Sequence, residues 1–260
     1  MVRWGLYSLR NLWARRVTTA LTVVGLGLVV FVLLAVLMLA HGLERTLGKT
    51  GDPENVIILR KGALSEIGSS LSREEIRAVA AQPDVRLTAD GRPLAVAEVG
   101  LQLTLRKGQG GSLTSVTLRG TAPKALAVRP AILLIQGRLW KPGTTEIVVG
   151  ASIARQFPDA RVDRVLHFGN WAWTVVGVFE AGGSGFDSEV WGDAEQFLAT
   201  FHRTTFSSLT LRLAQPATLP AFKDRIERDP RFKFSVKREP EYYEGKAEGL
   251  ARMIRVTGLF

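Results

Sequence analysis

The run from Thr18 to Ala40 constrains this chain most, because its 23 residues include no charged side chain. The hydrocarbon core of a bilayer is about 30 Å thick, and a helix rising about 1.5 Å per residue needs roughly 20 apolar residues to cross it. Lipid offers no hydrogen-bond partner to backbone amides, so a single spanning segment must be helical. The sequence therefore predicts a transmembrane helix over residues 18–40.

The residues before this run predict its orientation. Arg3, Arg10, Arg15 and Arg16 precede the span, and no acidic residue lies among them. Lys and Arg close to a span stay on the cytoplasmic side. We expect a bacterial inner-membrane protein with a cytoplasmic N-terminus, whose main domain is periplasmic or extracytoplasmic from about His41 onward.

Two other interpretations of the run are weaker. The h-region of a signal peptide has about 7–15 residues and is followed by a small-residue cleavage site, whereas this run is longer and continues into HGLERTLGK without such a site. A buried core helix is also apolar, but it is seldom uncharged for so long.

Residues 1–17 form a candidate helix in the membrane interface. They place tryptophans and leucines among arginines at roughly helical spacing, and both Trp and Arg are suited to the headgroup level. Trp4, Arg10, Arg15 and Arg16 are the candidate residues for contact with a cytoplasmic protein. An ordinary positively charged flank with no partner explains the same pattern equally well.

Within the span, Thr18, Thr22 and Gly25 fall at i, i+4 and i+7 and thus on one helix face. Small residues let helices approach closely in lipid, where packing drives their association. These three residues are the candidate face for packing against other transmembrane helices.

Composition excludes several classes of function. The chain of 260 residues has no cysteine, which removes disulfides, zinc–thiolate sites and thiol nucleophiles. Its net charge of +10 is spread over the chain, and the basic residues are interleaved with acidic ones, as in TLPAFKDRIERDPRFK. No basic stripe with aromatic residues is present, so we expect no nucleic-acid partner.

Beyond the span, the pattern predicts an α+β fold with a mixed α/β core domain over residues 41–238. A capping box from Ser72 to Glu75 and an N-cap at Asp193 mark two of the helices. The predicted strands are 55–61, 93–107, 112–120, 131–137, 145–150, 164–170, 171–183, 207–214 and 232–239. The predicted helices are 72–83, 151–157, 193–201, 219–230 and 239–260, with a short helix or turn over 121–130.

The first helix is predicted to continue for two turns past the span and to stop at residues 51–53. The late strand–helix–strand units suggest a ferredoxin-like or split βαβ layout. The last segment, 239–260, is expected to lead toward a second span.

Sequence features of an enzyme are missing. There is no P-loop motif, and His41, His167 and His202 are far apart and match no metal-ligand spacing. We therefore predict no catalytic, cofactor-binding or metal-binding residue in the chain. An anchored hydrolase remains as a minor hypothesis, which rests on Ser184 in GGSGFDSEVW, although Phe186 replaces the last glycine of a nucleophile elbow.

The same Gly-rich stretch has two further interpretations. A flexible hairpin tip or lid is one, because glycine tolerates positive φ. A loop that contacts a partner subunit is the other, and it makes Ser184, Phe186 and Asp187 the candidate contact residues.

The order of these segments resembles the FtsX-like, MacB-type permeases of ABC transporters. The resemblance rests on NLWARRVTTALTVVGLGLVVFVLLAVLMLAHGL, EIVVG, WTVVGVFEAGGSGFDSEVWGD and EYYEGKAEGLARMIRVTGLF, and it spans nearly the whole chain. It implies a transmembrane helix followed by an extracytoplasmic core domain of the MacB type. It also implies a homodimer, a separate cytoplasmic ATPase that binds ATP, and a periplasmic adaptor protein.

The chain departs from this family in one respect. Members have three more transmembrane helices near the C-terminus, but no run after Ala40 reaches 18 apolar residues, and the sequence ends at RVTGLF. We expect either a truncated product or further helices on another polypeptide. The alternative is a complete single-span binding or scaffold protein with a periplasmic partner. The substrate and the direction of transport are not marked by any motif.

Overall fold

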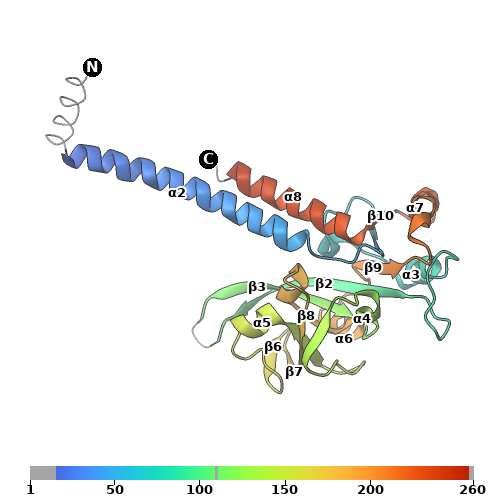
Figure 1. The fold of residues 1–260 in the computed structure, drawn as a ribbon. Helices are drawn as coiled ribbons and strands as arrows, with labels where there is room; N and C mark the ends of the chain where they lie inside the picture. The colour runs from blue at the N-terminus through green and yellow to red at the C-terminus, as the bar shows by residue number, and fades with distance from the viewer. Residues whose placement is uncertain (1–15, 109–110, 258–260) are drawn as a thin grey trace. The chain divides into compact units, whose positions relative to one another are not determined.

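The computed structural model describes residues 16–108 and 111–257 (Figure 1). The chain divides into two compact units, which are described separately. One contains the residues up to Arg45 and those from Glu248 onward, and the other runs from Thr46 to Ala247. The candidate interfacial helix of residues 1–17 lies outside the described residues, apart from its last two positions.

The first unit is dominated by helix α2, Arg16–Leu47. Its segment Arg16–Leu39 has a mean hydropathy of 2.9 and is long and apolar enough to cross a membrane. None of this segment is buried inside the structure, which suits a helix whose surroundings are lipid. The helix was predicted to end at residues 51–53, but it ends at Leu47, where the Thr50 amide hydrogen-bonds to the Leu47 carbonyl and Gly51 adopts a φ of 95°.

The second unit is built on a ten-stranded sheet in the described residues. Its strand order is β10-β1-β9-β2-β3-β8-β5-β7-β4, and β6 pairs with β7 off this path. The strands are β1 (Asn55–Arg60), β2 (Ala95–Arg106), β3 (Leu113–Thr121), β4 (Leu133–Gly137), β5 (Glu146–Gly150), β6 (Val165–Phe168), β7 (Trp171–Glu180), β8 (Glu189–Asp193), β9 (Ser208–Arg212) and β10 (Phe234–Arg238).

The helices of this unit lie between these strands in chain order, except for α8, which follows β10. They are η1 (Glu66–Gly68), α3 (Arg73–Ala80), α4 (Ala125–Val128), α5 (Ala151–Gln156), η2 (Gly185–Ser188), α6 (Ala194–Thr200), η3 (Pro216–Thr218), α7 (Leu219–Arg228) and α8 (Glu239–Thr257). The predicted capping box of α3 is present, with Ser72 and Glu75 bonded reciprocally. Asp193 caps α6 as expected.

Residues 55–98 and 207–238 form what we call the ferredoxin-like lobe. Its strands are ordered β10-β1-β9-β2, all neighbours are antiparallel, and α3 and α7 each connect two strands that are not adjacent. This is the split βαβ arrangement. The sequence located both βαβ units late in the chain, whereas the structure pairs the late unit β9-α7-β10 with the early unit β1-α3-β2.

Residues 99–206 form an inserted lobe, which begins within β2 and ends just before β9. The long strand β2 joins the two lobes, because its first part pairs with β9 and its remainder pairs with β3 (Figure 1). Strand β8 pairs with β3 in parallel and with β5 antiparallel at the centre of this lobe. Three apolar clusters fill the unit, and one of them brings Phe186, Trp191, Tyr242 and Tyr243 together.

Strand β8 is the one strand of the described residues that the sequence did not predict. Its five residues EVWGD include two carboxylates and a glycine, so they show no alternation of apolar and polar side chains. All five residues are nevertheless buried, because neighbouring strands cover both edges and a buried arginine pairs with Glu189. The α+β class predicted from the sequence is confirmed.

Candidate functional site

The most unusual feature of the second unit is a cluster of buried charged side chains in the middle of the sheet. Each member is at most 7% exposed. They come from η1, β2, β3, the end of α4, β8 and the start of α8: Glu66, Glu98, Arg119, Arg129, Glu189 and Glu239. Buried charges require paired, hydrogen-bonded partners, so this cluster is the natural starting point for the site.

Arg119 is fully engaged by carboxylates. Its Nε and Nη2 donate to the two oxygens of Glu189 at 2.7 and 2.9 Å. Its Nη1 donates to Glu66 Oε1 at 2.7 Å and to Glu98 Oε2 at 3.0 Å. The planar guanidinium fork suits such bidentate pairing. Arg119 therefore ties β3 to β8, to η1 and to β2.

Arg129 extends the cluster toward α8. Its two terminal nitrogens each donate to one oxygen of Glu98 at 2.8 Å, and its Nε donates to Glu239 Oε1 at 2.7 Å. Glu98 is thus shared by both arginines. Through Arg129, the first residue of α8 is connected to the strand at the centre of the sheet.

The arginines keep the shared carboxylates ionised. Burial alone would raise the pKa of Glu98, but the charges of Arg129 and Arg119 outweigh it and lower that pKa to about 2. Burial likewise opposes ionisation of Glu66, and Arg119 overcomes it, so the pKa of Glu66 is also lowered. Among the described residues, no group of three or more His, Asp or Glu is arranged to hold a metal ion. The cluster is a set of fixed ion pairs.

The segment that follows α2 is bonded to the start of α8 through Glu239. The other oxygen of this carboxylate accepts from the Asp52 amide at 3.0 Å and from Asn55 Nδ2 at 2.7 Å. Thr50, in the same segment, is buried, and its hydroxyl accepts from the Gly185 amide at 2.8 Å. The residues just after α2 and the first residue of α8 are therefore held to one another and to the sheet.

The candidate contact loop belongs to this site. Phe186 packs edge-on against Trp191 and Tyr243, with ring centroids 5.6 and 5.5 Å apart, and the guanidinium groups of Arg119 and Arg129 lie 5.2 and 5.0 Å from its ring. This geometry combines aromatic packing with cation–π attraction. The loop thereby closes one side of the charge cluster.

The side chains of Ser184, Phe186 and Asp187 are all buried within the domain. Both Asp187 oxygens accept from backbone amides of the same loop, at Ala181 and Gly183. The exposed part of the loop consists of Gly182, Gly183 and Ser188. Contact with a partner stays a prediction, and it would have to use these exposed positions unless the loop opens.

A catalytic role for Ser184 lacks the required geometry. Its hydroxyl is buried and has no hydrogen-bond partner among the described residues. A serine nucleophile needs a general base within hydrogen-bond distance. His41, His167 and His202 are likewise in separate places, on α2, on β6 and just after α6.

The remaining predicted site residues fall on or before α2. Trp4, Arg10 and Arg15 lie outside the described residues, and Arg16 is the exposed first residue of the helix. Thr18, Thr22 and Gly25 are exposed on the described structure, and the Thr22 hydroxyl bonds to the Thr18 carbonyl at 2.9 Å. Both the cytoplasmic contact and the helix-packing face stay predictions.

Comparison with models of protein families identifies the family to which the fold belongs. The model of the MacB-like periplasmic core domain matches residues 19–229. The chain belongs to the family of MacB-like periplasmic core domains. With the apolar helix α2, this makes it a membrane-anchored relative of ABC transporter permeases. The comparison with curated proteins returned no match.

Two solved structures share the fold at low sequence identity. The extracellular domain of the noncanonic ABC-type transporter YknZ from Gram-positive bacteria is 14% identical, with a TM-score of 0.54 over 70% of this chain and 99% of that one. The periplasmic region of MacB from Actinobacillus actinomycetemcomitans is 13% identical, with a TM-score of 0.54 over 77% of this chain and 92% of that one. These similarities support the MacB-like architecture of the domain.

The charge cluster was not predicted from the sequence. The sequence feature that points to it is a single charged residue inside an otherwise apolar strand, as with Glu98 in AVAEVG and Arg119 in SVTLRG. A charge inside a buried strand is rarely tolerated without a partner. Such isolated charges indicate that buried ionic partners exist elsewhere in this MacB-like domain, although they do not indicate which residues pair.

Proposed function

We propose that this chain is a permease subunit, or the N-terminal portion of one, in an ABC-type transporter or mechanotransmission complex. A separate cytoplasmic ATPase binds and hydrolyses ATP, and the chain itself performs no catalysis. The N-terminus is cytoplasmic and the MacB-like domain is on the outer face of the inner membrane. The complex contains a second copy of the chain, and a periplasmic adaptor docks on its domain.

The observation that carries this proposal is the bonding of Glu239. It joins the first residue of α8 to Asp52, Asn55 and Arg129 at once. A displacement of the segment after α2 or of α8 is therefore delivered to Glu98 and Arg119 in the middle of the sheet. Packed, ion-paired elements respond as discrete units rather than deforming gradually. In this proposal the charge cluster passes movement of the membrane helices into the exported domain.

The first test is isolation of the full-length gene product in mild detergent and identification of the proteins that accompany it. Co-purification of a P-loop ATPase is expected. Reproducible absence of any ATPase from otherwise intact complexes contradicts the proposal and favours the single-span scaffold instead.

The second test measures coupling in that complex. Amide hydrogen exchange in β2 and α4 is compared with ATP and with ADP, and a nucleotide-dependent difference is expected in the native protein. Glu239→Gln should reduce this difference, because Arg129 loses its charged partner on α8. Glu241→Gln is the matched control, since Glu241 lies in the same turn but its side chain is 60% exposed. Equal effects of the two substitutions contradict the role given to Glu239.

A further inference from the structure

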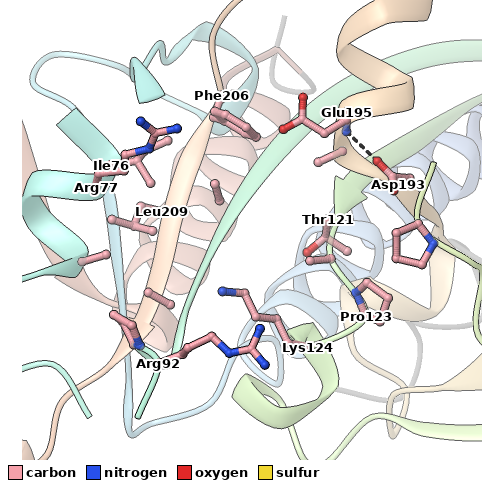
Figure 2. Close-up of a pocket in the computed structure, with 17 residues that line it drawn as sticks. Ile76, Arg77, Arg92, Thr121, Pro123, Lys124, Asp193, Glu195, Phe206 and Leu209 are labelled. Carbon is pink, nitrogen blue, oxygen red and sulfur yellow. Dashed lines mark hydrogen bonds between the residues drawn. The ribbon is translucent and has the colours of Figure 1, made fainter. Parts of the chain in front are cut away.

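A cleft of about 500 Å³ lies between the ferredoxin-like lobe and the inserted lobe (Figure 2). This volume falls within the range of small-molecule sites, roughly 300–1,000 Å³. One wall comes from α3 and β9, with Ile76, Arg77 and Leu209, and the other from the end of β3 and the start of α6, with Thr121, Pro123 and Asp193. No member of the charge cluster and no residue of the loop around Phe186 lines the cleft. Thr121 lies between the cleft and the charge cluster, because it lines the cleft and its hydroxyl bonds to Glu98.

The lining of the cleft is mainly apolar. Alanines, prolines, Ile76, Leu209 and Phe206 make up most of it. Three of the lining residues, Pro93, Pro123 and Pro142, have no backbone N–H to offer. Thr121 supplies the lining's one hydroxyl, and that group donates to Glu98 at 3.2 Å. A peptide bound here would therefore leave many of its own amides without partners, at a cost that a hydrocarbon chain does not incur.

The acidic residues of the cleft are already engaged. Asp193 accepts from the amides of Gly143, Glu195 and Gln196, at 2.8, 2.7 and 3.3 Å. Glu195 is paired with Arg73, whose Nη1 donates to it at 2.7 Å. Neither carboxylate is left to balance a cation inside the cleft.

The basic residues are less well matched. Arg92 is paired with Asp90, whereas the only charges that act on the Lys124 ammonium are those of Arg92 and Asp90, and it forms no hydrogen bond or ion pair with the described residues. Figure 2 shows Lys124 and Arg92 reaching toward the same end of the cleft. Partial burial and the nearby charge of Arg92 lower the pKa of the Lys124 ammonium, while Asp90 opposes the shift. An anion beside Lys124 would oppose this lowering of the pKa, because an opposite charge favours the protonated ammonium.

We propose that this cleft binds a single-chain amphiphile with one anionic headgroup. The acyl chain lies along the alanine- and proline-rich walls, and the headgroup pairs with Lys124 and is attracted by Arg92. The apolar lining provides contact area without hydrogen-bonding demands, and the unmatched cation provides orientation. The inference goes beyond the proposed coupling function and does not depend on it.

The test uses dodecanoate carrying a photoreactive diazirine at the end of its chain. The probe is added to the full chain in phosphatidylcholine vesicles, irradiated, and located on the protein by peptide mass spectrometry. Labelling is expected at the cleft walls, on the segments that contain Ile76, Ala97 and Phe206. Unlabelled dodecanoate should displace the probe about tenfold better than dodecanol, which has the same chain and no charge. Labels confined to α2, or equal displacement by the alcohol, overturn the proposal.

Three variants test the role of Lys124 without disturbing the core, because the residue is only partly covered and belongs to none of the three apolar clusters. Lys124→Gln should weaken displacement by dodecanoate at least about fivefold, a factor equal to about 1 kcal/mol. Lys124→Arg should restore it, because the charge is kept. Lys141→Gln, an exposed lysine outside the lining, is the control and should leave binding unchanged. Unchanged binding in Lys124→Gln also overturns the proposal, as does stronger displacement by an acidic peptide than by dodecanoate.

Discussion

Gly51 lies so close to Glu239 that position 51 has no room for a side chain. A Cβ atom there would be 2.8 Å from Glu239 Cγ and 3.1 Å from its carbonyl carbon. Gly51 also has a φ of 95°, which L-residues rarely adopt. The contact brings the segment after α2 directly against the start of α8, and the Asp52 and Asn55 hydrogen bonds to Glu239 follow from this close approach.

Gly51→Ala is expected to destabilise the domain more than its backbone conformation alone requires. A left-handed conformation costs a non-glycine residue about 1–2 kcal/mol, and overpacking adds about 1–3 kcal/mol. Gly62→Ala is the control, because Gly62 has a φ of 86° but nothing lies within 4 Å of the position that an added methyl group would take. Thermal unfolding of the purified full chain measures both. Equal losses would show that the contact with Glu239 contributes nothing.

Arg129→Met is expected to lower the free energy of unfolding by about 3–5 kcal/mol. The substitution leaves Glu98 and Glu239 buried with fewer partners, and removing one member of a buried ion pair has costs of this size. Arg138→Met is the control, because the Arg138 side chain is 50% exposed in its pair with Glu146 and such pairs contribute about 0–1 kcal/mol. Denaturant unfolding compares the two, and a small loss in Arg129→Met would mean that the cluster is not a stabilising centre.

The sequence was most informative where a local pattern decides the structure. Alternation in residues 93–107 predicted β2, and the Ser72–Glu75 capping box predicted the start of α3, because both depend on neighbours in the chain. The two predicted strands 164–170 and 171–183 are present as β6 and β7, which are joined by a turn at Gly169 and Asn170, both at positive φ. The length and apolarity of residues 18–40 likewise predicted a helix.

The features that the sequence did not predict depend on partners far away in the chain. Because of Glu189 and Asp193, the sequence of β8 has the pattern of a loop. Its burial is explained only by its pairing with β3 and β5 and by the ion pair between Arg119 and Glu189. The charge cluster joins residues from Glu66 to Glu239, and one sequence carries no sign of which charges meet. The split of the ferredoxin-like lobe by residues 99–206 is hidden for the same reason.

Acid is expected to destabilise the domain. The pKa of Glu98 is about 2 in the folded protein against an ordinary value of 4.5, and the pKa of Glu66 is lowered as well. Both carboxylates therefore bind protons more readily when unfolded, so their contribution is full above about pH 4.5 and is lost as pH falls toward 2.

Denaturant unfolding at several pH values between about 5 and 2.5 measures this loss. Most of it should persist in about 1 M salt, because salt screens exposed pairs such as Arg138–Glu146 far more than buried ones. A free energy of unfolding that is constant or rises on acidification contradicts the assignment. If salt removed the whole pH dependence, exposed ion pairs would account for it, and the buried Glu98 and Glu66 would not.

Thr22→Cys and Gly25→Cys are expected to crosslink to another transmembrane helix in the intact complex. Their positions share a face with Thr18, both are exposed on the described structure, and small residues favour close helix packing in lipid. The chain has no other cysteine, so each introduced thiol reacts alone. Ala20→Cys is the control, because at about 100° per residue it lies roughly opposite Thr18 at a similar depth.

Crosslinking with bifunctional thiol reagents, followed by gel mobility, measures this contact. Protein adducts at positions 22 and 25 but not at 20 would establish a packing face, whereas equal reactivity of all three would make α2 a plain tether, because a helix surrounded only by lipid has no preferred side.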